Sequence, residues 1–158
     1  LLTGTAPGEL FVIRNAGNIV PNPDDHIEGV LGTIEYAASV LKVPEIIVCG
    51  HSHCGAMSGL MALDSLKSLP MVDTWVRQSE PALELLNNHQ KAEQTVWQLI
   101  IENVRLQVQR LESLDCVRAQ IDAGQMKVSG WVYEFETGDV HVIDPDSGQT
   151  STVSRESE

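Results

Sequence analysis

Short apolar runs and longer segments of helical spacing alternate along the first half of the chain. Residues 10–13 and 46–49 are continuous apolar runs, each soon followed by a glycine. Such runs are typical of strands buried on both faces. Residues 28–41 have helical spacing and end at Lys-Val-Pro, and residues 56–69 return to that spacing. Strand, helix, strand, helix at this interval predicts a parallel α/β sheet.

The second half continues with one long helix and a hairpin. Residues 70–81, bounded by two prolines, are expected to be less regular. Residues 93–114 predict a helix with one apolar stripe. The stripe consists of Trp97, Ile101, Val104, Val108 and Leu111. Residues 126–135 predict a strand that turns at Thr-Gly-Asp into a second strand over 140–143.

These elements predict an α/β fold with a mostly parallel β-sheet flanked by helices. An antiparallel edge strand comes from the C-terminal hairpin. We expect residues 1–146 to form a single domain and residues 147–158, which are polar and rich in serine, to form a tail.

Composition excludes several classes of protein. The 158 residues are 42% hydrophobic and only 4% aromatic, which fits one domain with an aliphatic core. The net charge of −12 opposes phosphate backbones, so nucleic acid is not an expected partner. Because no run of 18 apolar residues occurs, we expect no membrane span.

Three cysteines, Cys49, Cys54 and Cys116, do not suit a disulfide scaffold. They favour a reducing compartment, namely the cytoplasm or a reducing organelle or microcompartment. The chain does not begin with methionine, so a targeting segment upstream is compatible with it. Cys116 has no neighbouring ligand residue and is interpreted as structural.

The sequence Cys-Gly-His-Ser-His-Cys-Gly at 49–55 carries the chemistry. It lies between a predicted strand and a predicted helix, at the sheet edge where open α/β folds place their sites. His51 and Cys54 are three residues apart, and an imidazole with a thiolate suits zinc. Two donors do not complete a tetrahedral site. Alone, the pair is explained at least as well by a helix N-terminus with a hydrogen-bonded histidine and a core cysteine. Cys49 is expected to be a small buried hydrophobe.

A wider set of segments resembles the β-class carbonic anhydrases. The segments follow the order of that family at compatible spacing from residue 8 to about residue 145. They are Glu-Leu-Phe-Val-Ile-Arg-Asn-Ala-Gly-Asn (9–18), Glu-Tyr-Ala (35–37), Val-Cys-Gly-His-Ser-His-Cys-Gly-Ala-Met (48–57), Glu-Asn-Val (102–104), Gly-Trp-Val-Tyr (130–133) and Glu-Thr-Gly (136–138).

The resemblance implies an activity and a cofactor. The activity is reversible hydration of CO2 to bicarbonate and a proton, by attack of zinc-bound hydroxide, with one Zn²⁺ per subunit. His51 and Cys54 would be two of three protein ligands to that zinc. Arg14 and Tyr36 would lie at the substrate end of the pocket; a surface arginine and a core tyrosine are the simpler alternatives. The resemblance further implies a homodimer or a higher homo-oligomer.

His53 is a candidate proton shuttle, because an imidazole titrates near neutral pH. The simpler interpretation is a variable residue between two ligands. The other histidines, His26, His89 and His141, are expected to be surface or hydrogen-bonded residues.

One motif of the family is absent from these 158 residues. The family's remaining zinc ligand lies in a Cys-x-Asp-x-Arg sequence, whose Asp-Arg pair orients the zinc-bound group or gates the zinc. Either the sequence is incomplete at its front or the protein is a zinc-deficient relative. We expect missing sequence, because loss of that strand would leave two apolar strand edges facing a gap.

Two other functions remain open on the sequence alone. One is hydrolysis of a CO2-like molecule such as carbonyl sulfide or carbon disulfide. The other is a catalytically silent subunit that serves assembly.

Overall fold

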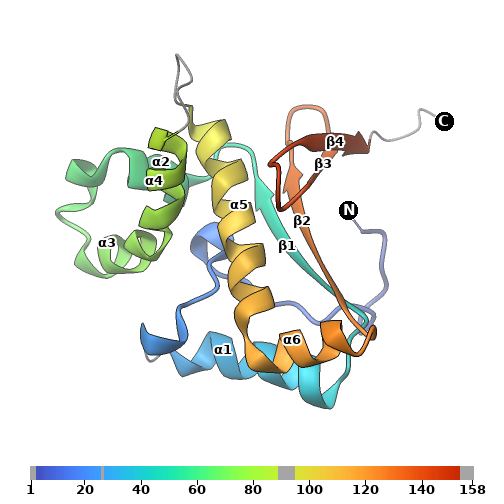
Figure 1. Cartoon of the computed structure of the whole chain (residues 1–158). Helices are drawn as coiled ribbons and strands as arrows, with labels where there is room; N and C mark the ends of the chain where they lie inside the picture. Colours follow the sequence, from blue (N-terminus) through green and yellow to red (C-terminus); the bar gives the residue numbers. More distant parts are fainter. Residues whose placement is uncertain (1–2, 26, 89–94, 154–158) are drawn as a thin grey trace.

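A mixed four-stranded sheet lies at the centre of the computed structural model, which describes residues 3–25, 27–88 and 95–153 (Figure 1). Strand β1 (Glu45–His51) is parallel to β2 (Lys127–Tyr133). Strand β3 (Val140–Ile143) is antiparallel to β2 and to β4 (Thr150–Val153). The predicted α/β class, with its antiparallel C-terminal hairpin, is confirmed.

Helix α5 (Val96–Ser113) packs along β1 and β2 (Figure 1). It begins with a capping box between Thr95 and Gln98, in which each side chain accepts a hydrogen bond from the other residue's backbone N–H. Val104 and Val108 on the predicted stripe are almost completely buried. The helix predicted over 93–114 is therefore confirmed from Val96 on, while residues 93 and 94 lie outside the described part of the chain.

Two glycines let α5 approach the sheet closely. A Cβ on Gly50 would lie 2.8 Å from one methyl of Val104, and a Cβ on Gly130 would lie 2.9 Å from the other. Contacts this short do not occur between real side chains, so the side chain of Val104 fills the space that both glycines leave.

Buried amides on α5 fix the chain near the start of the fold. The Asn103 amide donates to the carbonyl of Gly17 at 2.9 Å, and the Gln107 side-chain oxygen accepts from the backbone of Val20 at 2.8 Å. These bonds satisfy backbone groups that would otherwise be buried without partners.

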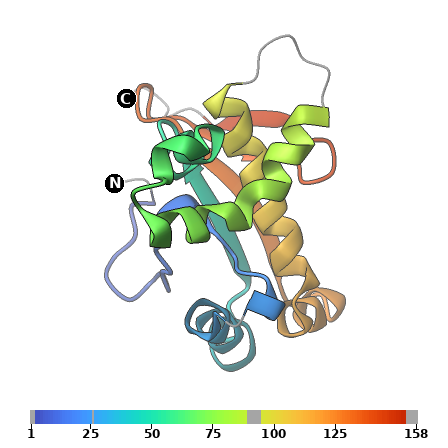
Figure 2. The same cartoon turned by 90° about the vertical axis from the view of Figure 1, so that its left-hand side faces the viewer.

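The remaining helices surround α5 and the ends of the sheet. In Figure 2, α4 runs beside α5, which agrees with the contacts between them. The α-helices are α1 (Glu28–Glu35), α2 (Gly55–Met61), α3 (Pro70–Val76), α4 (Glu80–Asn88) and α6 (Asp115–Asp122). The 3-10 helices are η1 (Ala16–Asn18), η2 (Pro23–Asp25), η4 (Leu63–Leu66) and η5 (Arg77–Ser79), and η3 (Tyr36–Val40) is π-helical.

Helices predicted over 28–41 and 56–69 are present with interruptions. The first is α1 continued by η3. The second divides into α2 and η4, because Ala62 leaves the helical region with φ −130° and ψ 58°.

The expectation of irregular structure over 70–81 was wrong. Pro70 lies in the first turn of α3 and Pro81 in the first turn of α4, where a missing N–H costs nothing.

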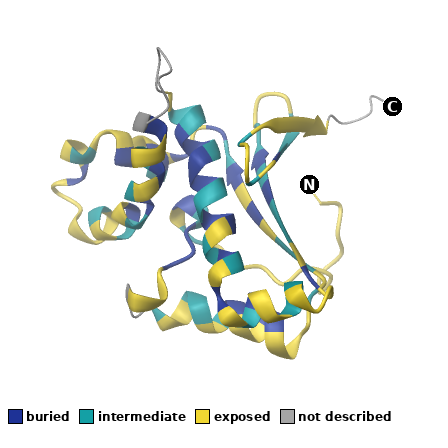
Figure 3. Ribbon diagram, viewed as in Figure 1, coloured by how far each residue is buried: buried dark blue, intermediate teal, exposed yellow. Residues whose placement is uncertain are grey.

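The prediction of a strand over residues 10–13 was also wrong. These residues have no strand partner among the described residues, and their side chains are exposed, Val12 by 70% (Figure 3). A lone extended segment leaves its backbone groups to water and buries neither face, so its apolar composition alone does not produce a strand.

Part of the expected polar tail is a strand. Residues 150–153 form β4, and residues 154–158 lie outside the described part. The turn before β4 is closed by Asp144, whose carboxylate accepts from the backbone N–H and the hydroxyl of Ser147, both at 2.7 Å. The boundary of the domain at residue 146 stays a prediction. None of the described helices has the length and apolar character needed to cross a membrane.

Candidate metal centre

The turn from β1 into α2 places the two candidate ligands close together in the chain. His51 is the last residue of β1, and Cys54 is the N-cap residue of α2. Cys54 is 3% exposed, and its carbonyl accepts from the backbone of Ser58 at 3.0 Å. The predicted strand-to-helix placement of this motif is confirmed.

One hydrogen bond decides which nitrogen of His51 is free. Its Nδ1 lies 2.7 Å from the backbone carbonyl oxygen of Ser52. A carbonyl oxygen can only accept, so Nδ1 carries the proton, and in the neutral ring Nε2 presents its lone pair. This is the arrangement by which metal-bound histidines are usually fixed.

The donor set fits part of a zinc site. One imidazole nitrogen and one buried thiol are ligands that zinc accepts. No group of three or more His, Cys, Asp or Glu side chains that could hold a metal occurs within the described ranges. In a tetrahedral centre His51 and Cys54 would supply two of the four positions.

The residues between the two ligands are held by the chain that follows β2. Ser52 donates its backbone N–H to the carbonyl of Tyr133 at 2.9 Å, and its hydroxyl accepts from the backbone of Phe135 at 2.9 Å. The same hydroxyl donates to Glu136 Oε2 at 3.0 Å. Neither Ser52 nor Glu136 was predicted as a site residue. The Glu-Thr-Gly sequence after a strand was the only signal in the sequence.

His53, the candidate proton shuttle, points into solvent and pairs with Glu136. Its side chain is 74% exposed, and its Nε2 contacts Glu136 Oε1. This contact is the largest of the causes that lower the pKa of the Glu136 carboxyl, and the carboxyl's bond to Ser52 adds to it. The shuttle role of His53 stays a prediction.

Arg14 and Tyr36, the two candidate substrate-pocket residues, make no hydrogen bond or ring contact with the segment from His51 to Cys54 in the described part of the chain. Both are exposed, Tyr36 by 50%, and the Tyr36 ring lies 6.3 Å from that of Phe11. The interpretation of Tyr36 as a core residue is therefore wrong. In the described part of the chain neither side chain makes a hydrogen bond or ring contact with His51 or Cys54. Their place at a substrate pocket remains a prediction.

Cys49, Cys116 and His141 belong to no candidate metal cluster among the residues that the structure describes. Cys49 is exposed as a residue, contrary to expectation, but partial burial of its thiol raises the pKa. Burial also raises the pKa of Cys116. His141 is hydrogen-bonded, as expected, with Glu134 and Thr152 each at 3.1 Å. His26 and His89 lie outside the described residues.

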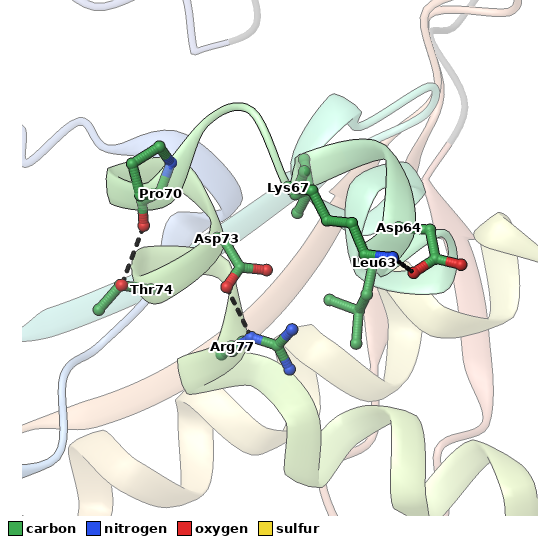
Figure 4. A pocket seen from close by; sticks show the side chains of 8 residues that line it. Leu63, Asp64, Lys67, Pro70, Asp73, Thr74 and Arg77 are labelled. Carbon is green, nitrogen blue, oxygen red and sulfur yellow. Dashed lines mark hydrogen bonds and ion pairs between the residues drawn. The ribbon is translucent and has the colours of Figure 1, made fainter.

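Two cavities among the described residues lie near or beside this region, and neither is lined by His51 or Cys54. One of about 520 Å³ lies beside the loop. It is lined by Ser52, His53, Ser58, Thr95, Val96, Trp97, Ile100, Glu134 and Glu136. The other, of about 230 Å³, lies between η4 and α3 (Figure 4). Its charges pair with one another, Lys67 with Asp64 and Arg77 with Asp73, each at 2.8 Å.

Comparison with known proteins settles the family. The carbonic anhydrase family profile matches residues 1–140. The solved structure of the β-carbonic anhydrase CcaA superposes on 96% of the chain with a TM-score of 0.88 and 36% identity, and the chain covers 76% of it. The chain belongs to the β-carbonic anhydrase family.

Other β-carbonic anhydrases agree with this assignment. A carbonic anhydrase from Pseudomonas aeruginosa is 41% identical over 91% of the chain, which spans 66% of that relative. Tetrameric β-carbonic anhydrases from Sordaria macrospora match 95% of the chain with a TM-score of 0.75 and 28% identity, and the chain covers 74% of the matched structure. The chain spans only 54% to 66% of the length of the first curated relatives that it matches.

Proposed function

We propose that the protein containing this chain catalyses the reversible hydration of CO2 to bicarbonate and a proton, with one zinc per subunit. The proposal is carried by the arrangement of His51 and Cys54: an imidazole whose Nδ1 is bonded to the Ser52 carbonyl, and a buried thiol at the N-cap of α2. Membership of the family supports the same reaction.

Each candidate site residue would have a separate role in this reaction. His51 would present Nε2, and Cys54 would present its sulfur as a thiolate, while the remaining ligands come from outside the described residues. When bound, zinc would supply a Lewis acid that makes hydroxide available near neutral pH. Arg14 and Tyr36 would lie toward the substrate.

The reaction releases a proton that has to reach solvent. His53 offers an exposed imidazole on the same loop, held by Glu136. We therefore assign it as the candidate proton carrier, since imidazole is the side chain best suited to carry protons at neutral pH.

We also propose that the protein is a homodimer or a higher homo-oligomer in a reducing compartment. Tetrameric relatives and the exposed apolar side chains of Leu10, Phe11 and Val12 support assembly. The three free cysteines support a reducing environment.

The test measures zinc content and CO2 hydration of the intact protein, together with H51A, C54A and a C116A control. We expect one zinc per chain in the wild type and in C116A, with both zinc and activity lost in H51A and C54A. A folded wild-type protein without zinc would contradict the proposal. So would a zinc protein that hydrolyses carbonyl sulfide or carbon disulfide but does not hydrate CO2.

A further inference from the structure

The carboxylate of Glu136 contacts both residues that lie between the candidate ligands His51 and Cys54. Glu136 contacts the Ser52 hydroxyl through Oε2 and the His53 ring through Oε1. Ser52 and Glu136 are 84 residues apart in the sequence, and the parallel pairing of β1 with β2 brings them together. A side chain outside the loop therefore contacts both residues that lie between His51 and Cys54.

Every polar group of Ser52 makes a hydrogen bond. Its N–H bonds to Tyr133, its hydroxyl accepts from Phe135 and donates to Glu136, and its carbonyl accepts from His51. The residue is only 5% exposed, so water does not replace these partners. The carbonyl that fixes the His51 ring is thus held in place by bonds to β2 and to the chain beyond it.

His53 has a backbone conformation that requires support. Its φ of 56° lies in the left-handed region, which residues other than glycine seldom adopt. The chain reverses there between His51 and Cys54, so the spacing of the two donors depends on this conformation. The contact of the His53 ring with Glu136 holds the residue in it.

We propose that Ser52 and Glu136 are positioning residues for the metal centre. They fix the orientation of the His51 ring and the spacing between His51 and Cys54 before the metal binds. This inference rests on the proposed function, because it assumes that the loop binds a metal. It goes further by assigning two residues that are not ligands.

The test uses the intact protein, freed of metal and titrated with Co²⁺, whose visible absorption reports on ligand geometry. We expect E136A to weaken Co²⁺ binding about 10-fold or more and to change the absorption spectrum, the effect usual for loss of an outer-shell partner. E136Q should restore binding, since an amide can accept from Ser52 and donate to His53. S52A should resemble E136A.

Glu134 supplies the matched control. It lies two residues earlier and pairs with His141 instead of the loop, so E134A should bind Co²⁺ as the wild type does. The melting temperatures of the metal-free E134A and E136A proteins show whether either substitution destabilises the fold. The exposed Glu136 side chain makes E136A informative even if the buried change in S52A prevents folding.

Two results would overturn the inference. In one, E136A binds Co²⁺ with wild-type affinity and spectrum. In the other, E134A and E136A weaken binding equally, which would indicate general loosening of the hairpin. A wild-type protein that binds no Co²⁺ would overturn the proposed function as well, so the two failures are distinguishable.

Discussion

Val104 lies where α5 packs against β1 and β2. It is completely buried, and its two methyl groups occupy the space above Gly50 and Gly130. Gly50 directly precedes His51. The packing of this side chain therefore limits how closely α5 can approach the end of β1 that carries His51.

We predict that G130A destabilises the protein by about 1–3 kcal/mol, because the new methyl group must displace Val104 from a filled core. Urea unfolding of the variant measures this free energy. G29A is the matched control, since a Cβ at Gly29 in α1 has nothing within 4 Å. It should be neutral or stabilising by up to about 1 kcal/mol. Equal stability of G130A and wild type would refute the tight-packing argument.

For single residues, the sequence was sufficient to predict the positions of side chains that belong to one short motif. The position of His51 and Cys54 at a strand-to-helix turn follows from local pattern. The partnership of Ser52 with Glu136 does not, since it depends on the register of two strands far apart in sequence. Tyr36 was open to two interpretations, a substrate-pocket residue or a core residue, because its place on a helix did not distinguish them.

Among the elements, the β3–β4 turn offers a test by pH. The Asp144 carboxyl accepts two hydrogen bonds from Ser147, and these bonds lower its pKa below the usual 3.8. A carboxyl with a depressed pKa in the folded state stabilises that state fully above its unfolded pKa. The contribution is lost as the pH falls through the folded value.

We therefore predict that D144A has a lower melting temperature than wild type at pH 6, and that the gap narrows as the pH falls below about 4. Melting followed by circular dichroism at several pH values checks this. A D144A gap that is constant down to pH 2 would contradict the assignment.

Which elements could be predicted depended on whether their pattern was local. Periodicity predicted α5, an apolar run predicted β1, and the apolar and aromatic residues before the Thr-Gly-Asp turn predicted β2. Residues 10–13 have the same kind of pattern, yet a strand also needs a neighbour. The β4 strand was missed because Thr-Ser-Thr-Val at an exposed edge lacks the apolar face on which strand prediction relies.

Charge is the property that belongs to the whole molecule. The 22 acidic and 10 basic residues give a net charge of −12, so the folded chain repels itself. Such repulsion opposes the compact state and is screened by salt.

We predict that the melting temperature rises between low salt and about 0.5 M NaCl, where the Debye length is only a few ångströms. Differential scanning calorimetry measures the shift. The same comparison close to the isoelectric point should give a smaller rise, because the charge is then nearly balanced. A melting temperature that falls with NaCl at pH 7 would show that attractive ion pairs outweigh the repulsion.

The parallel pairing of β1 with β2 also has a consequence for the order of folding. The bond from Ser52 in this loop to Glu136 forms only when a partner 84 residues later has arrived. Contacts of such long sequence separation close slowly, because much chain entropy is lost before they form. We therefore predict that this loop reaches its final conformation late in folding. A metal ion in solution would meet a finished loop and would not serve as the nucleus around which the chain collapses.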